Sequence, residues 1–122
     1  MHGFSISIPV PPSVNHMHKS GRGYRYSTAE YRNWQRSAGW EVLRQKPVPL
    51  TACRYEVELT LPAKLRGDID NRIKPVLDLL VKLGVVPDDR FCASVRASAD
   101  KALVNLASVS VRSVPDGKNP PF

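Results

Sequence analysis

The sequence contains no long apolar run, and only two of its 122 residues are cysteines. No stretch approaches the roughly 18 apolar residues of a membrane-spanning helix. The N-terminal residues lack the charged start and long apolar core of a secretory signal. Cys53 and Cys92 do not have metal-binding spacing, so we expect two free thiols in a reducing compartment. Together these features predict a cytoplasmic protein without a membrane segment.

The sequence also has no internal repeat and no glycine-rich phosphate loop. The missing loop argues against a phosphotransferase or phosphatase that acts on small nucleotides. The chain length suits one domain with a modest core. We expect this domain over residues 1–114, followed by a flexible tail over 115–122 that holds three prolines.

Apolar residues recur with strand and helix periods in the order β-α-β-α-β-β. Strands are expected over residues 4–10, 54–61, 91–99 and 103–112, and helices over 28–45 and from 71 or 72 to 83. This order predicts an α+β fold, a small single domain in which two helices pack on one face of a mixed sheet.

Several local features can be predicted more closely. Ser27 and Glu30 have capping-box spacing at the start of the first helix. Pro75 is acceptable only in the first turn of the second helix, and Gly84 follows its end. We expect a loop over residues 16–26, a bulge in the last strand, whose alternation is imperfect, and an antiparallel hairpin formed by the last two strands.

Positive charge is concentrated in the first half of a chain whose net charge is +7, because residues 1–55 hold eight Lys or Arg and only two Glu. Such an excess favours a polyanionic partner, with nucleic acid first and an anionic membrane second. The loop over 16–26 interleaves Lys19, Arg22 and Arg25 with two tyrosines. That mixture suits phosphate contact and base stacking, or else a solvated surface loop. Arg32 and Arg36 form either a solvated helix face or a phosphate track, and the sequence leaves this open.

Five of the eleven acidic residues fall within 22 positions, at Asp68, Asp70, Asp78, Asp88 and Asp89. Crowded carboxylates raise one another's pKa unless a cation intervenes, and a hard divalent ion such as Mg²⁺ is the usual one. In an extended chain Asp68 and Asp70 project to one side while Ile69 points into the core. Lys74 would stabilise charge that develops on an attacked phosphate. The cluster therefore predicts a metal site for phosphodiester hydrolysis.

The same residues have simpler interpretations. Asp70 or Asn71 would cap the second helix, and Asp88 with Asp89 would form a turn. Asp78 is more typical of an exposed or ion-paired helix residue than of a metal ligand. Whether Asp89 returns to Asp68 depends on how residues 84–88 fold, which the sequence does not settle.

Two motifs resemble one known family. The first is Asp-x-Asp-Asn-x-x-Lys-x-x-x-Asp-x-Leu from Asp68, then a glycine and Asp88-Asp89; the second is a strand that runs into Pro-Pro-Ser-x-Asn, ending at Asn15. Both are similar to the RusA family of Holliday-junction resolvases, or crossover junction endodeoxyribonucleases, over nearly the whole chain.

The resemblance implies a homodimeric endonuclease that uses Mg²⁺, with Mn²⁺ able to substitute, and no small-molecule cofactor. Its substrate would be branched DNA, a four-way junction that it cuts symmetrically. The resemblance assigns catalysis to Asp68, Asp70, Lys74 and Asp89, and metal binding to the three aspartates. Gly67 stands where the family often has a basic residue, which shifts the expected DNA contact. The expected DNA-binding residues are Asn15, Lys19, Arg22, Arg25, Lys64 and Arg66. The alternative is a non-catalytic nucleic-acid-binding homodimer with a structural acidic cluster.

Overall fold

The computed structural model describes residues 3–16, 18–20, 25–65 and 67–115. Its strands are β1 (Gly3–Pro9), β2 (His18–Ser20), β3 (Arg25–Ser27), β4 (Arg54–Pro62), β5 (Cys92–Asp100) and β6 (Leu106–Val114). Its helices are α1 (Ala29–Gln45) and α2 (Ile73–Lys82), with short 3-10 helices η1 (Val14–His16), η2 (Ile69–Arg72) and η3 (Asp89–Phe91). None of the helices among these residues is long and apolar enough to cross a membrane.

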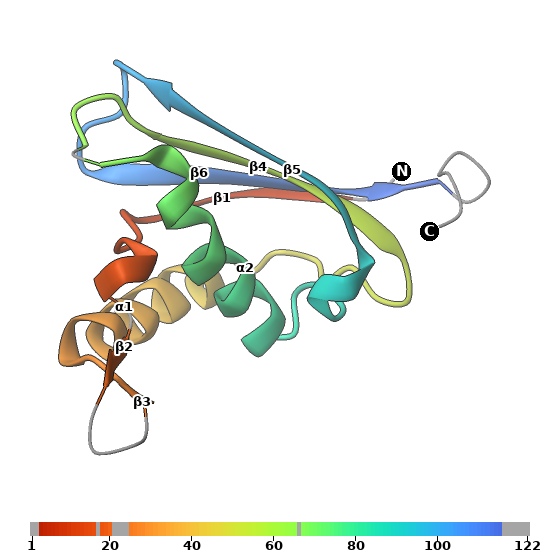
Figure 1. The fold of residues 1–122 in the computed structure, drawn as a ribbon. Coiled ribbons are helices and arrows are strands. Elements are labelled where there is room, and N and C mark those ends of the chain that lie inside the picture. The colour runs from red at the N-terminus through yellow and green to blue at the C-terminus, as the bar shows by residue number, and fades with distance from the viewer. Residues whose placement is uncertain (1–2, 17, 21–24, 66, 116–122) are drawn as a thin grey trace.

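Four strands form the main sheet in the order β1-β6-β4-β5, in which β4 and β5 are parallel and the other pairs antiparallel. Both α-helices lie on one face of this sheet (Figure 1). The predicted α+β class and its mixed sheet are therefore confirmed. Residues 16–26 were expected to be a loop, but β2 and β3 pair there as a separate two-stranded sheet.

The core lies between the sheet and the helices because each strand turns one side toward α1 and α2. Along β4, Tyr55, Val57, Leu59 and Leu61 are all buried, while Glu56 and Glu58 alternate with them. Val76, Leu79 and Leu80 form the buried side of α2. A strand with this alternation fits only where one sheet face is covered and the other faces solvent.

The predicted hairpin of the last two strands is wrong. In the sheet β4 lies between β5 and β6, so these two strands are not neighbours. Parallel strands need a long crossover, and α2 provides it by returning the chain to the outer side of β4. Strand β6 instead inserts between β1 and β4, where Ala107, Val109 and Val111 are buried. Alternation shows which side chains share a face, but it does not show which strand lies alongside.

The predicted bulge in the last strand is also wrong. Strand β6 keeps a continuous register with both β1 and β4. The bulge was predicted because Val104 and Leu106 are out of phase with Val109 and Val111. Val104 lies in the connection before the strand, and Leu106, its first residue, is on the exposed side, so no bulge is needed. The register shift of the sheet instead falls between Tyr55 and Glu56, where β4 pairs with β5.

The helix ends follow local chemistry. The N-cap of α1 is Thr28, whose hydroxyl accepts a hydrogen bond from the Tyr31 amide at 3.1 Å. The cap therefore lies one residue after the predicted Ser27 box. Pro75 is in the first turn of α2, and Gly84 adopts a φ of 74° just after its end, as predicted.

Helix α1 is fixed against the edge strand β1 by side-chain hydrogen bonds. The Trp34 indole donates to the Pro9 carbonyl at 3.0 Å. Gln45 accepts from the Ser7 amide at 2.9 Å and donates to the Ser7 carbonyl at 2.7 Å. These bonds hold α1 at two places along its length in a defined position relative to β1.

Candidate active site

The first acidic pair lies just after β4. Gly67 has a φ of 85°, Asp68 is extended, and η2 begins at Ile69. The pair is therefore not in a continuous extended chain as predicted, and Ile69 is 38% exposed instead of lying in the core. Both Asp68 and Asp70 are exposed.

Neither residue of the capping alternative caps α2. The N-cap position is Arg72, with no side-chain cap hydrogen bond, and Asp68 likewise makes no such bond at the start of η2. The exposed carboxylates of Asp68 and Asp70 are therefore not used to begin these helices.

Arg72 ties this acidic segment to the N-terminal Pro-Pro loop. Its guanidinium donates to the Pro11 carbonyl at 2.6 Å, across 61 positions of sequence. The adjoining η1 packs against both η2 and α2. Asn15, a predicted DNA-binding residue in η1, therefore lies next to the segment that carries Asp68 and Asp70.

Lys74 lies in the first turn of α2 and forms an ion pair with Asp78. Its ammonium nitrogen is 3.5 Å from an Asp78 carboxylate oxygen, and 61% of the lysine side chain is exposed. This contact confirms that Asp78 is an ion-paired helix residue. Exposed pairs of this kind contribute little to stability, so Lys74 is held only loosely.

The second acidic pair lies in the turn before β5. The Asp88 carboxylate accepts from the Arg90 amide at 3.1 Å, and this hydrogen bond lowers its pKa. A hydrogen bond with the Asp88 side chain raises the pKa of Asp89, and the Asp78 charge adds to this effect while Lys74 opposes it. Asp88 thus acts as a turn residue, and Asp89 lies within electrostatic reach of the Lys74–Asp78 pair.

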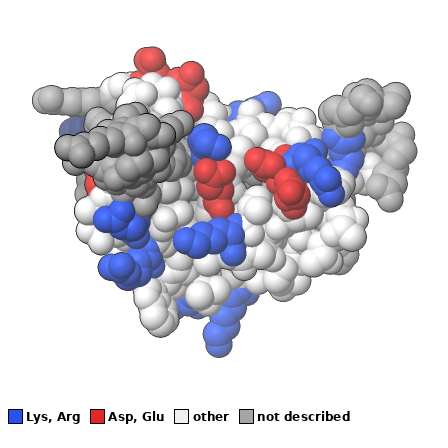
Figure 2. All heavy atoms as spheres, turned by 60° about the horizontal axis from the view of Figure 1, so that its bottom comes forward, with Lys and Arg blue, Asp and Glu red and all other residues white. Residues whose placement is uncertain are grey.

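The two acidic pairs are not brought together into one group. Among residues 3–16, 18–20, 25–65 and 67–115, no three His, Cys, Asp or Glu side chains lie close enough to hold a metal ion. On the face that carries the helices, acidic side chains form separate patches with basic side chains beside them (Figure 2). In Figure 1, η2 and the cyan η3 lie toward opposite ends of α2, which is about 15 Å long.

The other predicted DNA-binding residues fall in different places. Lys64 is exposed in the turn after β4, where it and Lys101 line a cavity of about 390 Å³. Lys19 and Arg25 lie in β2 and β3, of which the structure describes the backbone alone. Arg22 and Arg66 lie outside the described residues, as does the tail after Pro115.

Tyr55 was missed as a residue that positions the site. Its hydroxyl donates to the carbonyl oxygens of Pro87 at 3.3 Å and Asp88 at 3.4 Å. Burial, aided by the charges of Cys92, Asp89 and Asp88, raises the pKa of Tyr55 to about 12. The available signal was a tyrosine on the buried side of a strand, because a buried phenol needs a hydrogen-bond partner.

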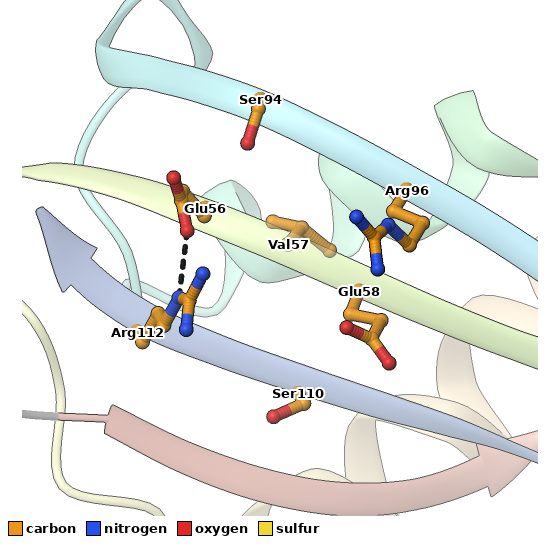
Figure 3. A pocket seen from close by; sticks show the side chains of 7 residues that line it. All are labelled: Glu56, Val57, Glu58, Ser94, Arg96, Ser110 and Arg112. Carbon is orange, nitrogen blue, oxygen red and sulfur yellow. Dashed lines mark hydrogen bonds and ion pairs between the residues drawn. The ribbon is translucent and has the colours of Figure 1, made fainter.

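The open face of the sheet carries a second polar group, which is separate from the acidic segments. There Glu56, Glu58, Ser94, Arg96, Ser110 and Arg112 line a cavity of about 220 Å³ (Figure 3). The Arg112 guanidinium donates to Glu56 at 2.6 Å. Two acids and two bases balance in charge, so this face has no net attraction for a polyanion.

Exposed carboxylates beside a lysine on a basic α+β domain suit phosphodiester chemistry. The family model described as "Endodeoxyribonuclease RusA" matches residues 8–112, which include Asp68, Asp70, Lys74 and Asp89. The chain therefore belongs to the RusA endodeoxyribonuclease family, as the sequence motifs had predicted.

Curated relatives agree with this assignment. The chain is 30% identical over 90 residues to the crossover junction endodeoxyribonuclease RusA of Aquifex aeolicus, covering 72% of this chain and 71% of that protein. It is 28% identical over 103 residues to the protein of the same name from Escherichia coli O139:H28, covering 79% and 82%. With the protein from E. coli K12 it shares 29% identity over 96 residues, or 73% of this chain and 76% of that one.

Replacement of Tyr55 by Phe tests its part in holding the Asp88–Asp89 turn. We expect Tyr55→Phe to lower the free energy of unfolding by about 1 kcal/mol, because the carbonyls of Pro87 and Asp88 lose the hydroxyl that donates to them. Hydrogen exchange of the Arg90 and Phe91 amides, both bonded to Asp88, should become faster. Tyr31→Phe is the matched control, a buried tyrosine on α1. Equal exchange rates in both variants would show that Tyr55 does not support the turn.

Proposed function

We propose that this protein is a Mg²⁺-dependent endonuclease that resolves four-way DNA junctions by symmetric phosphodiester hydrolysis. One observation carries the proposal: the family match spans residues 8–112. Within this range Asp68 and Asp70 lie just before α2, Lys74 lies in its first turn, and Asp89 lies in the turn that follows it. All four are exposed, so a phosphate on a large substrate can reach them.

The donor chemistry suits magnesium. Carboxylate oxygens are the hard ligands that Mg²⁺ prefers, and in phosphoryl-transfer sites it is often held by one or two carboxylates plus substrate phosphates. Asp68 and Asp70 are exposed and take no part in helix capping. Under this proposal Asp68 and Asp70 hold the ion and the bound DNA supplies further oxygens. Asp89, which the structure does not bring together with them, would reach the same ion only if residues 84–88 rearranged. A bound magnesium ion would lower the pKa of its water and neutralise charge on the phosphate.

Lys74 places a positive charge near the acidic residues of this site. It lies one helical turn before Asp78 on α2, and its charge also reaches Asp89. In free protein it is paired with Asp78. Under this proposal the lysine stabilises the charge that develops on the phosphate oxygens when a phosphate enters.

A homodimer follows from the symmetry of the proposed reaction. Two cuts related by a twofold axis require two sites related in the same way, and a twofold dimer provides them. One protomer has a single copy of the motif. We therefore propose that the active species contains two chains.

Asp70→Asn tests the metal-dependent reaction. We expect this variant to lose cutting of a synthetic four-way junction in Mg²⁺ while still binding the junction, because removing negative charge does not weaken contact with DNA. Wild-type protein should lose cutting in EDTA and regain it in Mn²⁺. Glu41→Gln, which removes the same charge from α1, should cut normally. Wild-type rates from Asp70→Asn would contradict the metal site, and binding without cutting by wild type would favour the non-catalytic alternative.

Removal of either partner of the Lys74–Asp78 pair separates catalysis from ion pairing. We expect Lys74→Ala to slow cutting by about 10²- to 10³-fold, the usual effect of losing one group that stabilises the transition state. Asp78→Asn breaks the same pair and should cut within a few-fold of wild type. If both variants lose activity equally, Lys74 acts through the ion pair alone.

The mass of the protein in solution tests the dimer. The chain mass is 13.6 kDa, so light scattering should give twice this value at the concentrations used for cutting. Titration of wild-type protein with catalytically inactive Asp70→Asn should then produce mixed dimers that nick one strand of the junction. A protomer mass throughout, with full cutting, would contradict the dimer.

A further inference from the structure

A groove between the two α-helices is lined by three basic side chains. Its residues come from α1 and from the end of α2, namely Arg32, Gln35, Arg36, Leu79, Lys82 and Leu83, and they enclose about 410 Å³. Leu79 is buried and Leu83 half-buried, so they form an apolar floor. The three cationic side chains are exposed at its rim, and none of these lining residues is a carboxylate.

The spacing of these cations suits a repeating anion. Arg32 and Arg36 are four residues apart on α1, which places their β-carbons about 5–6 Å apart on one side of the helix. Lys82 faces them from the last turn of α2. The Arg36 guanidinium donates to the neutral Asn33 amide oxygen at 3.5 Å, and this contact does not neutralise its charge.

The groove continues the candidate active site along the same helix pair. Lys74, Asp78 and Lys82 follow one another at four-residue spacing along α2, which places them on one side of that helix. Asp78 is itself paired with Lys74. The proposed catalytic lysine and the basic groove therefore lie along one interhelical surface.

We propose that this groove binds the phosphate backbone of one arm of the branched DNA, beyond the phosphate that is cut. The inference rests on the proposed function for the identity of the DNA. Three cations over an apolar floor favour contacts to phosphates over contacts to base edges, and the one neutral polar side chain of the lining, Gln35, is hydrogen-bonded to Tyr31. The balanced charges of the open sheet face offer no comparable surface.

The salt dependence of binding measures these contacts directly. Binding of a fluorescent four-way junction is followed by anisotropy in EDTA over a series of KCl concentrations, so that no cutting occurs. Each phosphate contact contributes about 0.9 to the slope of log K against log salt. We expect Arg36→Gln and Lys82→Gln each to make the slope shallower by about 0.9, and the double variant by about twice as much.

Arg96→Gln is the matched control, since Arg96 is exposed on the opposite face of the sheet and should leave the slope unchanged. Thermal melting of all variants shows whether they remain folded, as substitutions at exposed sites usually do. If the groove variants match Arg96→Gln while wild-type protein cuts junctions, the groove proposal fails and the nuclease stands. If the slopes change as expected but wild type never cuts, the groove stands and the nuclease fails. Absence of junction binding by wild type overturns both.

Discussion

The parallel pairing of β4 with β5 is the constraint on which the rest of the structure depends. Two parallel neighbours cannot be joined by a tight turn, so α2 must run back across the sheet between them. This crossover places η2 at its start and η3 at its end (Figure 1). The acidic pairs, the lysine between them and the groove beside α1 all take their positions from this one helix.

Much of the fold could be predicted because its patterns are local. Alternation along β4 and the stripe of Val76, Leu79 and Leu80 on α2 each depend on a few neighbouring residues. The neighbours of β5 and β6 could not be predicted, since strand order depends on which unpaired edge each strand reaches. Small shifts, such as the cap at Thr28 instead of Ser27, reflect two similar hydroxyl residues that compete for one helix start.

The candidate site, like the fold, could be predicted from the sequence only in part. Asp68, Asp70, Lys74 and Asp89 were predicted from sequence as the site residues; this assignment stays a prediction, and all four lie within the range of the family match. The arrangement of these residues in space could not be predicted, because separation along the chain does not fix the path of residues 84–88. The partners of Tyr55 and Lys82 could not be predicted either, because each lies beside a residue from another element, Asp88 for Tyr55 and Arg36 for Lys82. The sequence shows which side chains are available for a site, and the tertiary structure shows which residues lie beside each of them.

The hydrogen bond from Arg72 to Pro11 also has a mechanical consequence. It joins the loop that precedes Asn15 to the segment that carries Asp68 and Asp70, so it limits the movement of one relative to the other. An enzyme that grips a flexible polymer must keep the gripped point and the broken bond in register during thermal motion. If Asn15 contacts DNA as predicted, this short tether would provide that registration without a rigid framework around the whole substrate.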